Sequence, residues 1–212
     1  MTDWTAWHRG YDDPDSDLSR RRRSVQARIE EWLDAHPDGP LRVVSACAGD
    51  GTDLLEVLAR RPEGGRVTAR LLELDEGLAA GAEALARGHG LDGVEVLRRD
   101  AGRLSSYDGA VPADLVMWCG VFGNLDDTDV RATVRLTRRL AASGAHVVWT
   151  RGRFDEDAAE PTDAIRAWFA DEGFVELSLD APRSTGYRVG AHRFAGAPAP
   201  LGPDETFFTF VR

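Results

Sequence analysis

The stretch that decides the fold is Leu41-Arg42-Val43-Val44-Ser45-Ala46-Cys47-Ala48-Gly49-Asp50-Gly51. Its first part, 41–46, is an apolar run of strand length, and its second part consists of small residues that lead into a helical pattern. Small side chains let backbone groups approach a ligand closely, and the start of a helix favours negative charge. The stretch therefore predicts a buried strand, a ligand-binding turn and a helix, although turns of this kind also occur as plain connections.

The chain after this turn alternates between short apolar runs and helical patterns. We expect strands at Leu41–Ala46, Arg66–Leu74, Val94–Arg98, Asp114–Cys119 and His146–Thr150, and helices at Asp53–Arg61, Glu76–His89, Asp126–Ala142 and Thr162–Glu172. Such alternation predicts parallel strands with right-handed crossovers, and hence a doubly wound α/β sheet. Gly173–Leu179 and Glu205–Arg212 are two further expected strands with no helical period between them. They predict an antiparallel hairpin whose last strand is the C-terminus, with His192 in the loop between them.

The N-terminal part is expected to be helical. Ser16 or Asp17 can cap a helix, and the sequence 36–40 (HPDGP) ends it. One face of this helix carries Leu18, Val25, Ile29, Trp32 and Leu33. The run Arg20–Arg23 favours a solvated face, with an anionic-substrate or nucleic-acid patch as the alternative.

Residues 1–15 set aromatic side chains among acids. Trp4, Trp7 and Tyr11 recur at spacings of three and four, which one or two helical turns place on a common face. We interpret this segment as a lid that brings His8 or Tyr11 to a ligand, with permanent docking on the core as the alternative. One domain, 1–212, is expected, with 1–38 as an N-terminal lid or cap and 39–212 as the α/β core.

Composition excludes several classes of function. The net charge of −10 and the pI near 5.0 argue against a general binder of nucleic-acid backbones. All 26 basic residues are arginine, so Schiff-base chemistry and the P-loop lysine are excluded. The longest apolar or small stretch, Leu115–Gly123, is half the length of a membrane span. The N-terminus shows no secretory signal, and we expect a cytoplasmic protein.

Cysteine and histidine usage indicates no metal centre. Two cysteines, Cys47 and Cys119, are too few for a disulfide framework or a four-cysteine zinc site, and the five histidines show no metal-ligand spacing. The two cysteines follow strands expected to be neighbours. Two buried small residues are the favoured interpretation, and a redox pair is the alternative.

Carboxylates follow the next two expected strands. Asp75 comes 24 residues after Gly51, where it can accept hydrogen bonds from ribose hydroxyls, and Asp100 is placed to contact an exocyclic amine. Ala101 can add its backbone amide. We expect removal of the Asp75 carboxylate to weaken ligand binding while the melting temperature of the free protein barely moves.

Together these motifs resemble class I S-adenosylmethionine-dependent methyltransferases. Residues 43–51 are similar to that family's first motif, 71–75 to its ribose-binding strand end and 96–101 to its adenine-binding one. Residues 114–124 resemble its fourth strand and substrate-side loop, with Cys119 and Gly120 at the turn. The resemblance implies a seven-stranded, mostly parallel sheet with an antiparallel C-terminal strand, and S-adenosylmethionine as cofactor. The cofactor-binding residues it implies are Cys47, Ala48, Gly49, Asp50, Gly51, Asp75, Asp100, Ala101, Cys119 and Gly120.

The sequence departs from the family pattern at two positions. The family usually has an acid where Ser45 stands and a glycine where Cys47 stands. Ser45 carries no charge, so anchoring of the methionine ammonium must depend on backbone carbonyls or other residues.

No motif identifies a general base. Candidates are Tyr11, Asn124 and His192, together with Asp126, Arg151 and Arg153, all after the later strands or in the terminal segments. Asn124 is the only asparagine of the chain, and its alternative role is that of a turn residue. Trp118 and Trp149 are expected in the core.

The resemblance and the acidic balance favour methyl transfer to a small molecule, with nucleic acid unlikely as acceptor and no membrane partner. A nicotinamide-dependent oxidoreductase with a degenerate glycine turn is one alternative. A non-catalytic cofactor-binding module is another. The oligomeric state stays open between monomer and homodimer.

Overall fold

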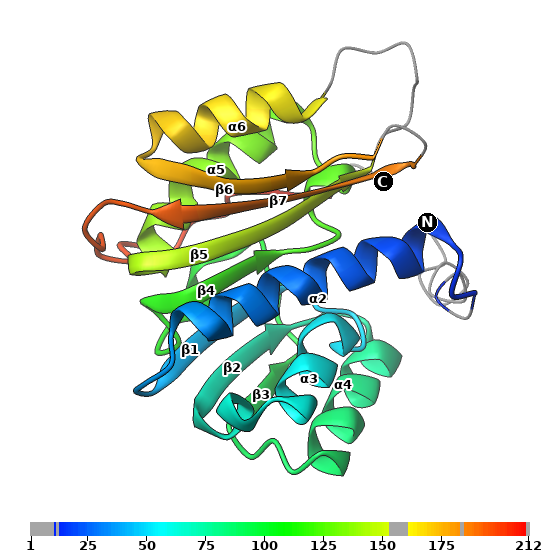
Figure 1. Ribbon diagram of the computed structural model, residues 1–212. Helices are drawn as coiled ribbons and strands as arrows, with labels where there is room; N and C mark the ends of the chain where they lie inside the picture. The colour runs from blue at the N-terminus through cyan, green and yellow to red at the C-terminus, as the bar shows by residue number, and fades with distance from the viewer. Residues whose placement is uncertain (1–10, 12, 153–160, 183–184, 211–212) are drawn as a thin grey trace.

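The computed structural model describes residues 11, 13–152, 161–182 and 185–210, and Figure 1 shows them as a twisted sheet with helices on both faces. The strands are β1 Leu41–Ala46, β2 Val67–Leu72, β3 Val94–Leu97, β4 Ala113–Trp118, β5 Ala141–Gly152, β6 Phe174–Asp180 and β7 Tyr187–Phe194. The α-helices are α2 Asp17–Ala35, α3 Thr52–Arg60, α4 Glu76–Gly88, α5 Asp127–Leu140 and α6 Pro161–Asp171. Short 3-10 helices are η2 Pro62–Arg66, η3 Leu104–Tyr107 and η4 Phe122–Asn124.

The sheet has the strand order β3-β2-β1-β4-β5-β7-β6. β1 to β5 pair in parallel, and β7 is inserted antiparallel between β5 and β6. The winding reverses between β1 and β4, which is where ligands bind in sheets of this kind. The prediction of a doubly wound, mostly parallel seven-stranded sheet is confirmed.

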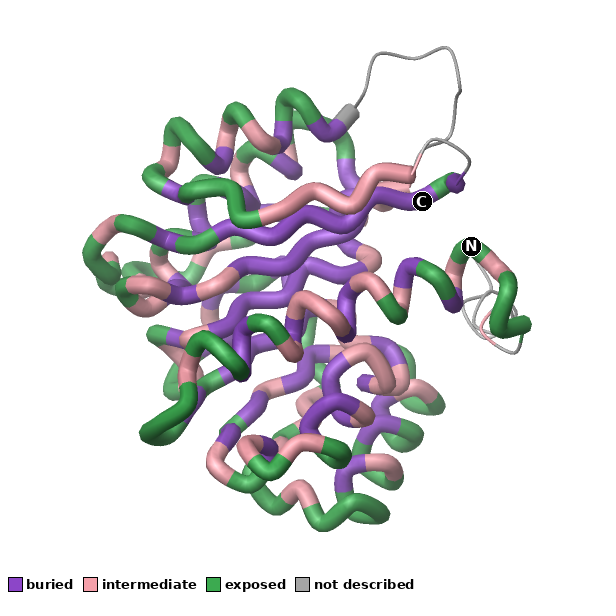
Figure 2. Tube along the Cα trace, viewed as in Figure 1, coloured by how far each residue is buried: buried purple, intermediate pink, exposed green. Residues whose placement is uncertain are grey.

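Both faces of the central strands are buried. Neighbouring residues of β4 alternate between the faces: Leu115 and Met117 pack toward α2 and α3, while Val116 and Trp118 pack toward α5 and α6. This double burial explains why the central strands are continuous apolar runs without polar alternation. Figure 2 shows the central strands as the most deeply buried part of the chain.

Helix α2 is part of this packed structure. Ser16 is its N-cap, and the Ser16 hydroxyl accepts a hydrogen bond from the Ser19 amide at 3.1 Å. Its apolar residues Val25, Ile29, Trp32 and Leu33 are fully buried, in a cluster that α2 forms with α3 and β7. Burial of side chains this large stabilises by roughly 1.5–3 kcal/mol each, as an upper bound. Within the described residues, no helix combines the length and apolarity needed to cross a membrane.

The C-terminal strand is the one element that the sequence places wrongly. The hairpin partner of β6 is Tyr187–Phe194, whereas within 205–210 only Thr206 forms an isolated bridge, to Arg103. The aromatic residues that suggest a strand there, Phe207 and Phe208, pack into the core. Their rings lie 5.9 and 6.2 Å from the Trp118 ring. Apolar burial, not sheet pairing, is therefore the reason for this aromatic run.

The true last strand has a weak strand pattern because it carries Gly190. A Cβ atom at Gly190 would lie 2.2 Å from the Trp149 ring, so the indole fits only against a glycine. Glycine is a poor strand former, and its presence hides β7 from a reading of the sequence.

Candidate active site at the carboxyl ends of the parallel strands

A cavity of about 890 Å³ opens at the carboxyl ends of the parallel strands, in the size range of small-molecule sites. It lies at the switch point between β1 and β4. Its walls include every cofactor-binding residue expected from the sequence: Cys47, Ala48, Gly49, Asp50, Gly51, Asp75, Asp100, Ala101, Cys119 and Gly120. The fold thus brings these residues together around one space.

The turn after β1 requires a glycine at its end. Gly51 has a φ of +73°, and a Cβ atom there would lie 2.7 Å from Leu55 and 2.9 Å from Leu71. Gly51 is also the N-cap of α3 and supplies no side-chain cap. The Asp50 carboxylate accepts from the Thr52 amide at 3.1 Å instead.

Cys47 is the only described non-glycine residue with a positive φ, at +50°. The left-handed region costs an L-residue about 1–2 kcal/mol. The position where the family has glycine is therefore a position where this backbone needs one, and the cysteine stores strain next to the cavity.

Glu73 connects this turn to the end of β2. One of its carboxylate oxygens accepts from the Gly49 amide at 2.8 Å, and the other accepts from the Asp75 amide at 2.9 Å. The Ala48 amide donates to the Leu72 carbonyl at 3.0 Å and ties the same turn to β2. Glu73 thus lies half-buried at the base of the cavity, where the two turns meet.

Asp75 has a structural role as well as a place in the cavity wall. It is the N-cap of α4, and its carboxylate accepts from the Leu78 amide at 3.0 Å. Loss of such a cap costs about 0.5–2 kcal/mol. We therefore expect removal of this carboxylate to lower the stability of the free protein, in contrast to the expectation from the sequence.

The turn after β3 is fixed in a similar way. The Asp100 carboxylate accepts from the Gly102 amide at 2.8 Å, and the Ala101 carbonyl accepts from the Tyr107 hydroxyl at 2.8 Å. Phe208 packs against this turn. A Cβ atom at Gly102 would lie 2.4 Å from the carbonyl oxygen of Phe208, so only glycine fits there. Asp100 and Ala101 are held at the cavity by the 3-10 helix that follows and by the C-terminal segment.

The two thiols stay protonated. Burial raises the pKa of Cys47 well above its usual range, and the nearby carboxylates of Glu73 and Asp100 raise it further. Burial likewise raises the pKa of Cys119. A thiol is a weak nucleophile and metal ligand, so the environment of these residues favours packing over redox chemistry. Among the described residues, no cluster of three or more His, Cys, Asp or Glu side chains could hold a metal ion.

The loop after β4 is built around Gly120 and Asn124. The Gly120 amide donates to the Thr150 hydroxyl at 2.8 Å, and the Asn124 side-chain amide donates to the Gly120 carbonyl at 2.7 Å. Asn124 therefore closes this loop and also lines the cavity, so its turn role is observed and its catalytic role stays a prediction.

Tyr11 lies in the cavity wall, where its hydroxyl accepts a hydrogen bond from Arg21. Burial raises the pKa of Tyr11 far above its ordinary value of 10. The residue is a neutral phenol at neutral pH, so it does not serve as a phenolate base. The other parts of the expected lid, Trp4, Trp7 and His8, lie outside the described residues.

His192 is not in a loop, as the sequence suggests, but in β7. Its side chain is 1% exposed, its Nδ1 accepts from the Trp149 indole at 3.2 Å, and the cavity wall does not include it. Burial lowers its pKa to about 4. The expectation that His192 contacts a ligand from a loop between the last strands is wrong, because its ring stacks 4.4 Å from Phe169 in the core.

The remaining candidate bases stabilise local structure. Asp126 is the N-cap of α5, and Arg151 donates to the Phe122 carbonyl at 3.0 Å and pairs with Asp127. Neither belongs to the cavity wall. Arg153 lies outside the described residues.

Several solved structures are similar to this chain in their fold. Magnesium protoporphyrin IX methyltransferase from Synechocystis PCC 6803 with bound SAM aligns over 92% of each chain, with a TM-score of 0.70 at 16% identity. An O-methyltransferase family protein from Burkholderia thailandensis aligns over 91% of this chain and 69% of its own, with a TM-score of 0.59 at 17% identity. The chain has the class I methyltransferase fold. A SAM-dependent methyltransferase from Aquifex aeolicus aligns with a TM-score of 0.54 at 14% identity, over 80% of this chain and 89% of its own. No protein-family model and no curated protein sequence matches the chain.

Within this methyltransferase fold, the cavity includes residues that motif analysis did not identify. They come from α2, from β7 and from the C-terminal segment: Asp17, Leu18, Arg21, Arg22, Tyr187, Phe208, Thr209 and Phe210. The motifs follow the strands β1 to β4, so they identify only the cavity residues at the ends of these strands. The Arg20–Arg23 run and the C-terminal aromatic run were the available signals for its outer walls.

Proposed function

We propose that this chain transfers a methyl group from S-adenosylmethionine to a small-molecule acceptor. The observation that carries the proposal is the convergence of the small-residue turn and three strand-end carboxylates, Glu73, Asp75 and Asp100, on one cavity at the switch point of a class I methyltransferase fold. The structural neighbours named above support methyl transfer through their fold.

The residues of the cavity fit such a cofactor. The turn 47–51 lets the backbone approach the ligand closely, Asp100 with the Ala101 amide suits an adenine ring, and a strand-end carboxylate suits a ribose. We propose Glu73 as the main ribose acceptor, because it is half-buried at the base of the cavity and tied to Gly49. Asp75, the choice from the sequence, is exposed and already caps α4.

The reaction asks mainly for orientation. When bound, S-adenosylmethionine supplies an activated methyl group together with its own leaving group. Holding two reactants in line can lower a barrier by roughly 7–11 kcal/mol. The chain contributes a floor of three turns, each fixed by a hydrogen bond from a backbone amide to a side-chain oxygen. The aromatic side chains of Phe208 and Phe210 add apolar surface to the cavity wall.

Calorimetric titration of the purified protein tests the proposal. S-adenosylmethionine and S-adenosylhomocysteine are expected to bind, while NADH is not. Tight binding of NADH without binding of either sulfur compound would favour the nicotinamide alternative and overturn the proposal. Binding of the cofactor without turnover on a broad panel of acceptors would favour a non-catalytic module instead.

The lid remains a separate proposal. If residues 1–15 close over the cofactor, their amides exchange quickly in the free protein and slowly with S-adenosylhomocysteine. Protection in both states would favour permanent docking on the core.

A further inference from the structure

The first turns of α2 form one wall of the cavity. Asp17, Leu18, Arg21 and Arg22 line it, at the spacings that place residues on one helical face. Asp17 is engaged, because its carboxylate accepts from the Gly186 amide at 2.7 Å. The guanidinium groups are therefore the groups of this wall that can offer charge to a ligand.

Arg22 is half-buried and held in place by an aromatic ring. Its guanidinium carbon lies 5.1 Å from the centre of the Tyr11 ring, and Arg21 contacts the same ring and its hydroxyl. A guanidinium held on an aromatic face keeps its fork of N–H donors available at its edge. Arg21 fixes Tyr11, and Tyr11 in turn orients Arg22.

Arg22 differs from three other arginines that lie on or against α2. Arg28, Arg60 and Arg61 each pair with a carboxylate of α2. Arg22 forms no ion pair with any carboxylate among the described residues, although the chain contains 36 acidic residues. A ligand anion therefore does not compete with a carboxylate of the described residues for this guanidinium.

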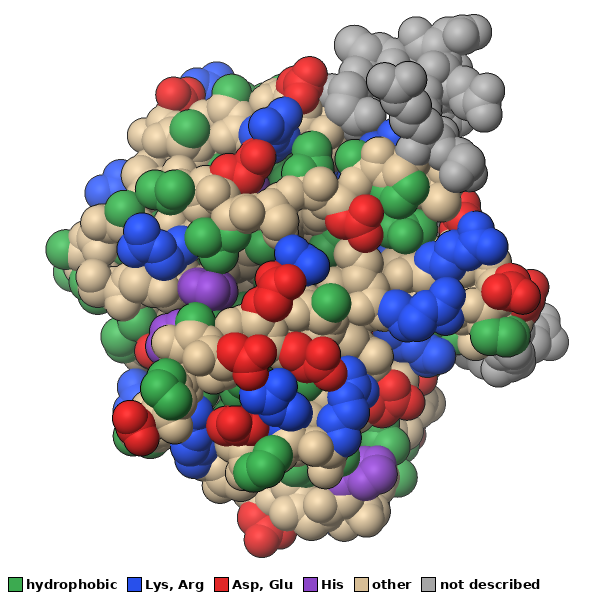
Figure 3. All heavy atoms as spheres, in the orientation of Figure 1, with side chains coloured by type: hydrophobic (Ala, Val, Ile, Leu, Met, Phe, Trp, Pro, Cys, Tyr) green, Lys and Arg blue, Asp and Glu red, His purple; other side chains and the backbone are tan. Residues whose placement is uncertain are grey.

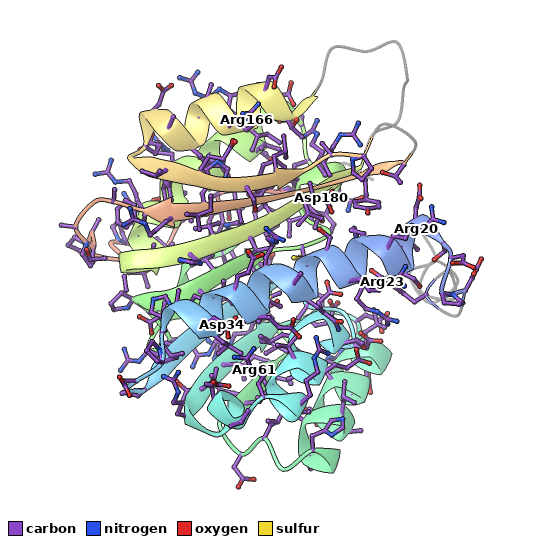
Figure 4. All side chains as sticks on the ribbon, in the orientation of Figure 1. Arg20, Arg23, Asp34, Arg61, Arg166 and Asp180 are labelled. Carbon is purple, nitrogen blue, oxygen red and sulfur yellow. The ribbon has the colours of Figure 1, made fainter. Side chains whose placement is uncertain are left out.

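The surface at the start of α2 supports an anion at this wall. The acids Glu73, Asp75 and Asp100 line the cavity at the strand ends, and Arg21 and Arg22 line it from α2. Arg99 and the acids Asp50 and Asp53 also belong to the cavity wall. Arg20 and Arg23 project from the same end of α2, where basic side chains gather on the surface (Figures 3 and 4). The chain as a whole has a net charge of −10, which repels anions, but the arginines at the start of α2 attract a small anion locally.

We propose that the methyl acceptor carries a carboxylate or phosphate group and that Arg22 binds this group at the mouth of the cavity. The inference rests on the proposed function, and it names the substrate class. A bidentate contact between guanidinium and carboxylate or phosphate supplies both affinity and orientation. Arg22 is then a specificity-determining residue.

Three small probes test the proposal on the protein saturated with S-adenosylhomocysteine. They are 4-hydroxybenzoate, phenyl phosphate and the neutral 4-hydroxybenzamide, each titrated by calorimetry. At least one anionic probe is expected to bind about tenfold or more tightly than the amide, and the better of the two distinguishes carboxylate from phosphate. Equal binding of all three probes would overturn the inference.

Variants then locate the site. Arg22→Ala is expected to weaken the preferred anion about tenfold or more, and Arg22→Lys less, because lysine keeps the charge but loses the fork. Arg20→Ala is the matched control: it removes the same charge from the same helix but lies outside the cavity wall. It is expected to change the affinity by less than about threefold, since an exposed charge is screened by salt. An equal loss in both variants would contradict a specific contact by Arg22.

Two further results separate this inference from the proposed function. If Arg22→Ala weakens S-adenosylhomocysteine but not methylthioadenosine, which lacks the carboxylate, Arg22 binds the cofactor and the inference fails while the proposed function stands. If S-adenosylhomocysteine does not bind the wild-type protein, the proposed function fails. The anion titrations on the ligand-free protein then decide only whether Arg22 binds an anion, by whether Arg22→Ala abolishes the preference for the anion.

Discussion

Glu73 and Gly49 are joined by a hydrogen bond of 2.8 Å from the glycine amide to a carboxylate oxygen, and the other oxygen of Glu73 holds the Asp75 amide. One side chain thus fixes the turn after β1 against the turn after β2. The separation of the two turns decides whether a ligand fits between them, so Glu73 is a structural and a candidate binding residue together.

Glu73→Gln is expected to weaken S-adenosylhomocysteine binding about tenfold or more. Glutamine replaces one carboxylate oxygen by an NH₂ group and removes the charge, so a ribose hydroxyl loses its charge-assisted bond, at about 1.5–3 kcal/mol. Calorimetry measures the effect. Asp75→Asn is the matched control, because asparagine caps a helix as well as aspartate does. A larger loss in Asp75→Asn would restore Asp75 as the ribose acceptor.

Asp75→Ala is expected to lower the free energy of unfolding of the ligand-free protein by about 0.5–2 kcal/mol. The cause is the loss of the cap at the start of α4, which Asp75→Asn preserves. Urea titration of the two variants measures the difference. Equal stability of the alanine and asparagine variants would show that the cap contributes nothing.

Cys47 provides a test of backbone strain beside the cavity. Cys47→Gly and Cys47→Ala both remove the thiol, but only glycine accepts a φ of +50° without strain. We expect the glycine variant to be the more stable of the two, by up to about 1 kcal/mol. The same pair at Cys119, whose φ is not positive, is expected to show the reverse order. A more stable alanine variant at position 47 would mean that the strain is relieved elsewhere.

The central part of the fold could be predicted because sequence and burial agree there. β1 has the predicted bounds, Leu41–Ala46, and α4 differs from its predicted range by one residue at its end. Strands that are covered on both faces are apolar throughout, and the helices between them are amphipathic. A continuous apolar run therefore predicts a strand here, and a helical period predicts a helix.

The last strand and the outer walls of the cavity could not be predicted for a different reason. The Phe207 and Phe208 side chains pack in the core beside Trp118, but their backbone does not pair with the sheet. A buried segment of this kind contains the same apolar residue types as a strand, so the sequence does not distinguish the two. His192 sits in a strand whose pattern Gly190 interrupts. For Arg22, the decisive fact is contact with Tyr11, eleven residues earlier, and no local pattern contains it.

Gly190→Ala is expected to destabilise the protein by about 1–3 kcal/mol or more. The added methyl group would lie 2.2 Å from Trp149, which is fully buried and cannot move without displacing its neighbours. Thermal unfolding measures the loss. Gly88→Ala, at the end of α4 with no atom within 4 Å of the added Cβ, is the control and is expected to be neutral or slightly stabilising.

His192 is expected to contribute to acid sensitivity. Burial lowers its pKa to about 4, against 6.5 for a free histidine, so between these values the unfolded state binds a proton that the folded state does not. Stability is therefore complete above about pH 6.5 and falls as the pH drops toward 4, by at most about 2–3 kcal/mol for this group. Protonation also removes the Nδ1 acceptor for the Trp149 indole.

His192→Asn is the informative variant, because the asparagine oxygen can still accept from Trp149 while the titrating group is gone. Urea unfolding at pH 7 and at pH 4.5 should show a smaller loss of stability in the variant than in the wild type. Some loss remains, since burial beside His36 and Arg193 also lowers the pKa of His146 to about 4. His89→Asn, at an exposed histidine, should keep the full wild-type loss. An unchanged pH dependence in His192→Asn would mean that His192 takes up its proton in the folded state without cost, which its burial between Trp149 and Phe169 argues against.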